Sequence, residues 1–193
     1  MAPRDQTTDN EDMTNPLYDE LFGRHADREA PFLHLPDGLA ISYADFLRMA
    51  ARFANALCDA GIAPGDRVAV QVAKSPSTLA IYAACAQAGT VFLPLNTAYT
   101  VSEMGYFLRD SGASLFVCDG ASESEFQDIC TEIGAPILTL NADGSGTLAA
   151  LAASQDDLFE TVPREASDLA AFLYTSGTTG RSKGAMLTQA NLL

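Results

Sequence analysis

Hydrophobic and polar positions along the chain divide it into short strands that alternate with helices. Short runs of consecutive apolar residues are typical of buried strands, and they occur at 68–72, 91–95, 115–118 and 137–140. The segments between and after these runs predict helices, which span 77–88, 102–109, 124–133 and 147–153. Buried strands that alternate with helices are typical of a parallel sheet with helices on both faces. The pattern therefore predicts an α/β fold.

A hairpin and a long helix are predicted before this alternation begins. Residues 32–35 and 39–43 are short alternating runs with turn residues between them, so we expect a β-hairpin. Ser42 and Asp45 come close to a capping box, and the apolar positions that follow fall on one helical face. A helix is therefore predicted from Ser42 until Gly61 ends it.

Composition divides the chain into three parts. Residues 1–14 are polar and acidic, and such a segment cannot bury enough apolar surface to fold, so we expect a disordered tail. Residues 15–168 carry the strand and helix pattern and form one predicted α/β domain. Residues 169–193 contain two further apolar runs, at 169–174 and 185–187, which predict the start of the next sheet. We expect that sheet to be incomplete within this sequence.

Charge restricts the class of partner. The formal net charge is −14, whereas nucleic acids and anionic membrane surfaces are recognised by basic patches. We therefore expect neither a nucleic acid nor a membrane as partner. The acidic N-terminal segment differs from an arginine-rich transit peptide, and a cytoplasmic location is expected.

One segment concentrates the polar chemistry of the chain: Tyr174-Thr175-Ser176-Gly177-Thr178-Thr179-Gly180-Arg181-Ser182-Lys183-Gly184. Glycines let the backbone come close to a ligand, and successive amides with neighbouring hydroxyls form a concavity that binds anions. The lysine adds a positive charge that can follow a phosphate as it leaves. The segment therefore predicts a polyphosphate site.

Two other interpretations fit this loop less well. A flexible Gly/Ser/Thr linker would not be expected between two apolar runs that read as strands. A Walker A loop needs Gly-Lys followed by Ser or Thr, whereas Lys183 follows Ser182 and precedes Gly184. We therefore expect a phosphate-binding loop of another kind.

Residues 174–184 resemble the phosphate-binding signature of the adenylate-forming superfamily, which includes acyl-CoA synthetases, luciferases and peptide-synthetase adenylation domains. A second segment, Pro94-Leu95-Asn96-Thr97-Ala98-Tyr99-Thr100, is similar to the malonyl-CoA synthetase branch. The resemblance runs from about Leu17 to the last residue and corresponds to the N-terminal part of such an enzyme. It implies the parallel, helix-covered sheet of an adenylate-forming N-terminal domain, truncated.

The resemblance also implies an AMP-forming acid–thiol ligase that uses ATP, Mg²⁺ and coenzyme A. Malonate or methylmalonate is the implied acid, with acetate, aryl or fatty acids as alternatives. The residues that would bind ATP are Thr175, Ser176, Gly177, Thr178, Thr179, Gly180 and Lys183, and Lys183 would also be catalytic. The groups that hold Mg²⁺, the ribose and the acid are expected beyond Leu193, so this chain alone should not make acyl-CoA.

Two less favoured functions remain open on the sequence. The same loop would also serve a nucleotide-binding module without catalysis. Residues 144–149 match the dinucleotide fingerprint Gly-x-Gly-x-x-Ala, but residues 141–143 separate them from the preceding run, which argues against a Rossmann turn. The four cysteines lack zinc spacing and read as buried free thiols, and no metal site is expected among them or the two histidines.

Overall fold

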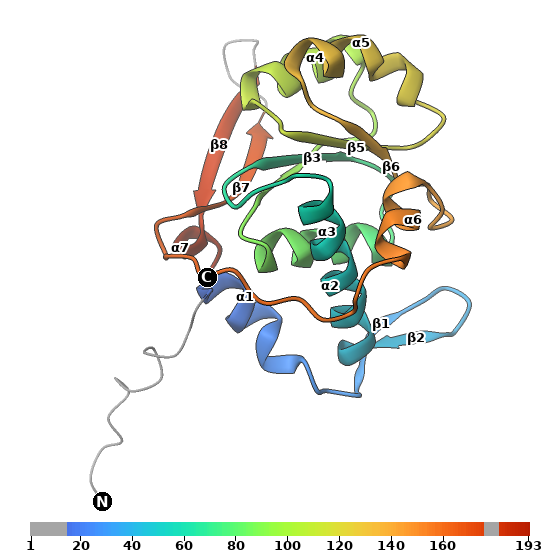
Figure 1. Ribbon diagram of the computed structural model, residues 1–193, viewed down its shortest axis with the longest axis vertical. Helices are drawn as coiled ribbons and strands as arrows, with labels where there is room; N and C mark the ends of the chain where they lie inside the picture. The colour runs from blue at the N-terminus through green and yellow to red at the C-terminus, as the bar shows by residue number, and fades with distance from the viewer. Residues whose placement is uncertain (1–14, 176–181) are drawn as a thin grey trace, which may run out of the picture.

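The computed structural model of the protein describes residues 15–175 and 182–193 and has a six-stranded sheet at its centre (Figure 1). The strands are β3 (Arg67–Gln71), β4 (Val91–Pro94), β5 (Leu115–Cys118), β6 (Ile137–Thr139), β7 (Leu169–Thr175) and β8 (Lys183–Thr188). Their order across the sheet is β6-β5-β3-β4-β7-β8. All are parallel except β8, which runs antiparallel to β7. The predicted α/β class is confirmed.

Helices cover both faces of this sheet (Figure 1). On one face, α2 (Tyr43–Asp59), α3 (Pro76–Gln87) and α6 (Thr147–Ala153) share an apolar core with Val68, Val70, Leu115 and Val117. On the other face, α4 (Val101–Ser111) and α5 (Glu123–Ile133) share a core with Ala69, Val91, Leu93 and Phe116. Successive side chains of a strand point to opposite faces. The continuous apolar runs of the strands therefore supply both cores.

The predicted hairpin and the helix after it are also present. β1 (Pro31–His34) and β2 (Ala40–Ser42) pair antiparallel and lie outside the main sheet. Ser42 caps α2, because its hydroxyl accepts a hydrogen bond of 3.0 Å from the Asp45 amide. This cap satisfies one of the amides that a helix leaves without an intrahelical partner.

Two short N-terminal elements are not predicted by the hydrophobic pattern. They are α1 (Pro16–Leu21) and a 3₁₀ turn at Gly23–His25. α1 has only six residues, of which two are buried, so it carries too little periodicity to be recognised. It packs beside α7 (Gln189–Leu192), the short helix that follows β8.

Asn15 and Gln189 connect segments that are far apart in the sequence. The fully buried Asn15 amide donates hydrogen bonds to the carbonyls of Ala86 (2.7 Å) and Val162 (3.0 Å). The buried Gln189 side chain accepts a hydrogen bond of 3.0 Å from the Leu17 amide. These contacts tie α1, the end of α3, the irregular segment 154–168 and α7 together.

β7 and β8 extend the sheet formed by β3 to β6. This arrangement differs from the expectation that residues 169–193 begin another sheet, because Ala171 of β7 pairs with Phe92 of β4. Pairing between strands distant in the sequence is decided by tertiary packing, which a local pattern does not contain. Residues 1–14, for which a disordered tail is expected, lie outside the described residues.

The cysteines depart from expectation at one position. Cys85, Cys118 and Cys130 are buried, and burial raises the pKa of all three thiols. Cys58, near the end of α2, is exposed, so the prediction of burial is wrong there. Across the part of the chain that the structure describes, no three His, Cys, Asp or Glu side chains are grouped to hold a metal ion. Within the same residues, no helix combines the length and hydrophobicity needed to span a bilayer.

Candidate functional site

Thr175 and Lys183 face each other at the end of the β7–β8 hairpin where residues 176–182 connect the two strands. They are directly paired in the strand register, and the Thr175 hydroxyl lies 3.4 Å from the Lys183 carbonyl oxygen. Both residues are exposed. Among the described residues, no carboxylate forms an ion pair with Lys183. The other predicted ATP-binding residues lie outside the described residues: Ser176, Gly177, Thr178, Thr179 and Gly180.

The loop end of the hairpin lies at the carboxyl edge of the parallel strands. β7 is parallel to β4, so Thr175, the last residue of β7, lies at the same edge of the sheet at which β3, β4 and β5 end. Open α/β sheets bind their ligands at this edge. Gln71, the last residue of β3, is buried at this edge. Its side-chain amide donates a hydrogen bond of 3.0 Å to the Asn96 carbonyl. The predicted phosphate loop therefore connects to the sheet where a ligand is expected.

Helix α4 forms hydrogen bonds with Tyr174 of β7 and with Ser182, the residue before β8. The Tyr174 hydroxyl donates a hydrogen bond of 2.7 Å to Asp110 Oδ2. On the other side of the loop, the Tyr106 hydroxyl donates a hydrogen bond of 3.2 Å to the Ser182 carbonyl. One helix thus fixes the residues immediately before and after the loop. Sequence reasoning missed this contact, because nothing local connects α4 with residues about 70 positions later.

Tyr174 is a neutral donor in this contact. Burial raises the pKa of Tyr174. The hydrogen bond to Asp110 and the negative charge of the Asp110 carboxylate raise that pKa further. The Tyr174 ring also packs on Phe107, with ring centroids 4.3 Å apart. The hydroxyl therefore remains protonated at neutral pH and continues to donate to Asp110.

Gly184 lets β8 pass close to the ring of Phe172. A Cβ atom at residue 184 would lie 2.3 Å from Phe172 Cε1 and 2.4 Å from Cζ, far inside van der Waals contact. Phe172 belongs to the core below α4, so its ring has little room to retreat. The last glycine of the signature thus has a packing role, which the sequence does not separate from phosphate binding.

The segment that resembles malonyl-CoA synthetases has structural roles of its own. Thr100 is the N-cap of α4 and forms a complete capping box with Glu103. Tyr99 packs on Phe107, with ring centroids 4.8 Å apart. Residues 94–100 therefore position α4, and α4 in turn positions the hairpin.

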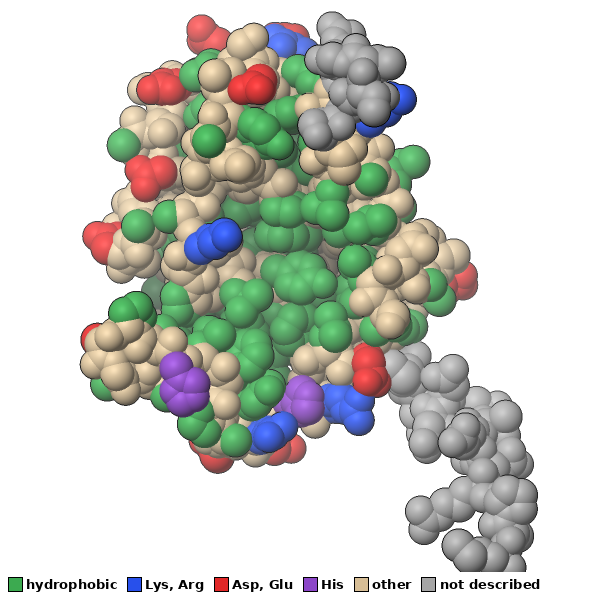
Figure 2. Space-filling view, turned by 180° about the vertical axis from the view of Figure 1, so that it is seen from behind, with side chains coloured by type: hydrophobic (Ala, Val, Ile, Leu, Met, Phe, Trp, Pro, Cys, Tyr) green, Lys and Arg blue, Asp and Glu red, His purple; other side chains and the backbone are tan. Residues whose placement is uncertain are grey.

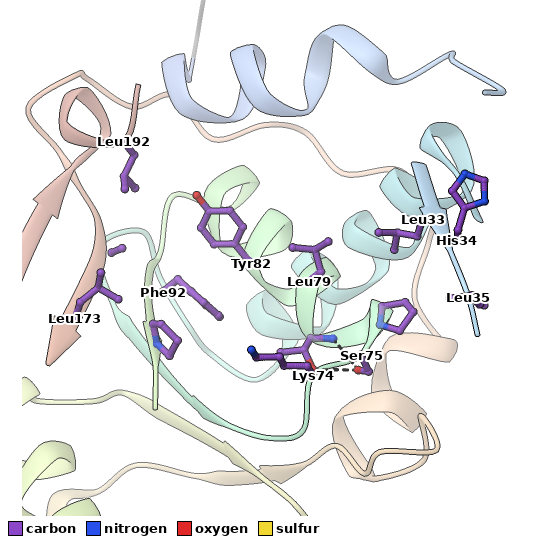
Figure 3. Close-up of a pocket in the computed structure, with 14 residues that line it drawn as sticks. Leu33, His34, Leu35, Lys74, Ser75, Leu79, Tyr82, Phe92, Leu173 and Leu192 are labelled. Atoms are coloured by element: carbon purple, nitrogen blue, oxygen red, sulfur yellow. Dashed lines mark hydrogen bonds between the residues drawn. The ribbon is translucent and has the colours of Figure 1, made fainter. Parts of the chain in front are cut away.

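A separate apolar cavity of about 720 Å³ opens between α3, β4, β7 and the β1–β2 hairpin. Figure 3 shows Leu79, Tyr82 and Phe92 directed into it. Lys74 and His34 are its basic residues, and no acidic residue belongs to its lining as far as the described residues define it. Its members come from segments far apart in the sequence, so hydrophobic periodicity gives no sign of it.

The second glycine of the dinucleotide-like match has a structural explanation. Gly146 precedes α6 with φ of 126°, and a Cβ there would lie 2.3 Å from the Thr139 carbonyl oxygen. The Thr147 amide donates a hydrogen bond of 2.9 Å to the Thr139 hydroxyl. Close approach of the two backbones accounts for Gly146 without a bound dinucleotide.

Comparison with known proteins places this geometry in a family. A family model described as AMP-binding enzyme matches residues 19–193. The chain belongs to the AMP-binding enzyme family. The resemblance carried by residues 174–184 is thus confirmed.

Relatives of this AMP-binding protein are longer than the chain. A feruloyl-CoA synthase from Amycolatopsis is 40% identical over 155 residues, which cover 80% of this chain and 30% of the relative. An oxalate–CoA ligase from Arabidopsis thaliana is 30% identical over 186 residues, which cover 94% and 36%. Among solved structures, ATP-bound MatB from Rhodopseudomonas palustris has a TM-score of 0.89 and 45% identity, covering 93% of this chain and 36% of MatB. The chain therefore spans about a third of the length of these relatives.

Proposed function

We propose that this chain is the N-terminal, ATP-binding part of an AMP-forming carboxylate–CoA ligase. The observation that carries the proposal is the pairing of Thr175 with Lys183 at the carboxyl edge of the sheet, inside the segment that resembles the family's phosphate signature. The family match and the CoA ligases among the relatives support the reaction class. We expect the ligase to work in the cytoplasm on small-molecule substrates.

The chemistry has two steps, and this chain would serve the first. A substrate carboxylate attacks the α-phosphorus of ATP, the bond to the bridging oxygen of the β-phosphate breaks, and pyrophosphate leaves. The Lys183 ammonium would stabilise the charge that moves onto pyrophosphate, and the Thr175 hydroxyl would donate to a phosphate oxygen. Further donors and turns would come from Ser176, Gly177, Thr178, Thr179 and Gly180. In the second step, the thiol of coenzyme A attacks the acyl carbon and AMP leaves.

Mg²⁺ would enter this site together with the triphosphate. The described residues contain no group of three side chains suited to hold a metal ion. Asp110, the carboxylate beside the hairpin, already accepts the hydrogen bond of Tyr174. The proposal therefore gives the described part of the chain no role in holding Mg²⁺.

Malonate or methylmalonate is the acid we propose. Two observations support it: the resemblance of residues 94–100 to malonyl-CoA synthetases, and the structural similarity to MatB, a malonyl-CoA synthetase. The relatives also include ligases for ferulate and oxalate. Assays of the full-length ligase with ATP, coenzyme A and each acid in turn would decide this, and preference for a monocarboxylate over malonate would overturn it.

Lys183→Ala tests the role of the loop. In the full-length ligase it should reduce adenylation, measured by pyrophosphate exchange, by about 10²-fold or more, because the leaving group loses its counter-charge. The melting temperature should change little, since Lys183 is exposed. If this variant exchanges pyrophosphate at the wild-type rate, Lys183 has no catalytic role, and a nucleotide-binding module without catalysis becomes the better interpretation of the loop. The 193-residue chain alone should form no acyl-CoA.

A further inference from the structure

Helix α4 lies beside the loop end of the β7–β8 hairpin, and two tyrosine hydroxyls join the helix to it (Figure 1). Tyr106 and Asp110 are four residues apart on α4, so they lie on the same side of the helix, one turn apart. Asp110 accepts a hydrogen bond from the Tyr174 hydroxyl of β7. Tyr106 donates one to Ser182, which directly precedes Lys183. The helix therefore holds the chain on both sides of the loop.

The Tyr106 hydroxyl binds the peptide group that carries the Lys183 amide. Its acceptor, at 3.2 Å, is the Ser182 carbonyl oxygen. A peptide group is planar, so the Ser182 carbonyl and the Lys183 N–H turn together. Tyr106 is half-buried, and its ring packs beside the buried Phe107, with ring centroids 5.5 Å apart. A ring held against the core thus restrains the backbone from which the Lys183 side chain extends.

Tyr174 is held on the partner strand by its ring and by its hydroxyl. The ring centroid lies 4.3 Å from that of Phe107, and the hydroxyl lies 2.7 Å from Asp110 Oδ2. The opposite side of β7 is apolar, because Ala171 and Leu173 line the cavity and hydrophobic side chains gather across that face of the molecule (Figure 2). As far as the structure describes the chain, the hydroxyl contacts that tie this end of the hairpin to another element thus come from α4.

β7 extends well beyond its pairing with β4. The register joins the two strands at Phe92 and Ala171, and Thr175 lies four residues farther along β7. At roughly 3.3 Å per residue, the loop end is about 13 Å from that pair. A rotation of about 5° there would displace the loop end by about 1 Å, and a misplacement of that size can cost about 10²-fold in rate. A restraint close to the loop end therefore has a large effect on the position of Lys183.

We propose that Tyr106 is a positioning residue for Lys183: its hydroxyl orients the Ser182–Lys183 peptide so that the lysine ammonium meets the charge that develops on pyrophosphate. This inference rests on the proposed function, because it gives Tyr106 a role in the adenylation step. Tyr106 acts through Lys183 and takes no part in the bond changes. Since the ammonium stabilises charge that appears only as pyrophosphate leaves, loss of the hydroxyl should lower kcat more than it raises the KM for ATP.

Tyr106→Phe removes the hydroxyl and keeps the ring. In pyrophosphate exchange by the full-length ligase, we expect kcat to be about tenfold lower and the KM for ATP to change less than about threefold. Tyr43→Phe is the matched control, because Tyr43 is also half-buried, packs beside the β1–β2 hairpin, and its hydroxyl has no hydrogen-bond partner among the described residues. Its kcat should equal that of the wild type. Equal kcat values for the two variants would overturn the proposal.

A double-mutant cycle with Lys183→Ala distinguishes positioning from a structural role. If Tyr106 acts through Lys183, Tyr106→Phe has no ammonium to misplace in the Lys183→Ala background, and exchange should fall no further. A fall of about tenfold in both backgrounds would show that Tyr106 acts only through the fold, and it would contradict this inference while leaving the proposed function intact. If Lys183→Ala itself exchanges pyrophosphate at the wild-type rate, the proposed function of the loop is wrong and the inference is wrong with it.

Discussion

The Tyr174 hydroxyl joins the strand before the phosphate loop to helix α4. Tyr174→Phe should lower the free energy of unfolding by about 1 kcal/mol, because one hydrogen bond to a carboxylate is lost while the exposed Asp110 regains water. Urea denaturation measures this change. Tyr99→Phe is the matched control, since its ring packs on the same Phe107 and its hydroxyl donates no hydrogen bond to any described residue. Equal losses in the two variants would mean that the hydroxyl of Tyr174 contributes nothing specific.

Gly184 is predicted to be intolerant of even a methyl group. Gly184→Ala should destabilise the protein by about 1–3 kcal/mol, the usual cost of overpacking, because the new Cβ overlaps the Phe172 ring. Gly105→Ala is the comparison: its Cβ would meet only Arg109 Nη1, at 3.2 Å, and alanine favours the helix. Thermal unfolding of both variants measures the difference, and Gly105→Ala should be as stable as the wild type or more stable. Equal destabilisation of the two variants would indicate a general effect of removing glycine and not a packing role of Gly184.

The N-terminus of α4 is predicted to depend on its capping box. Thr100→Ala should cost about 1 kcal/mol of unfolding free energy, whereas Thr100→Ser keeps the hydroxyl and should cost little. The preference among acids in the full-length ligase should be the same in both variants, since Thr100 contacts Glu103 and no substrate role is needed to explain it. A changed acid preference in Thr100→Ser would contradict this structural assignment.

The same capping box predicts a dependence on pH. Hydrogen bonds from the amide and hydroxyl of Thr100 lower the pKa of Glu103 below its ordinary value of 4.5. A carboxyl whose pKa is lower in the folded state stabilises the protein above its unfolded pKa, and this contribution disappears as the pH falls through the folded pKa. The stability difference between wild type and Glu103→Gln should therefore be present at pH 7 and shrink below pH 4.5. Denaturation at several pH values measures it, and a difference that grows on acidification would reverse the sign.

The strands and long helices could be predicted from the sequence because each carries its own apolar run, cap or terminal glycine. β5 and α6 agree with the predicted bounds at both ends, and Ser42 is the predicted cap of α2. The placement of β7 beside β4 could not be predicted, because the two strands are far apart in the sequence and their pairing is formed only on folding. The register shows one pair between them, Phe92 with Ala171. For the site, the signature residues are recognisable locally, whereas the contacts of α4 with the hairpin and the apolar cavity exist only after folding.

Asn15 is predicted to stabilise the assembly of the whole protein. Asn15→Ala leaves the carbonyls of Ala86 and Val162 without this donor, and the expected loss is about 2–6 kcal/mol, from roughly 1–3 kcal/mol for each of the two carbonyls. Asn55→Ala is a close control, because the half-buried Asn55 also donates to two carbonyls of the 154–168 segment, but through exposed hydrogen bonds that water can replace. Urea denaturation that gives equal losses for the two variants would show that burial of Asn15 adds nothing.

The hydrogen bond between Leu17 and Gln189 has a consequence during synthesis on the ribosome. The two residues are 172 positions apart. At about 5–20 residues per second, Gln189 is added roughly 9–34 s after Leu17. Throughout that interval the Leu17 amide lacks its acceptor while the strands and helices between them are already being made. Within residues 15–193, the contact between α1 and α7 is therefore among the last that the growing chain can form, and during that interval a chaperone that holds nascent apolar segments could still reach this side of α1.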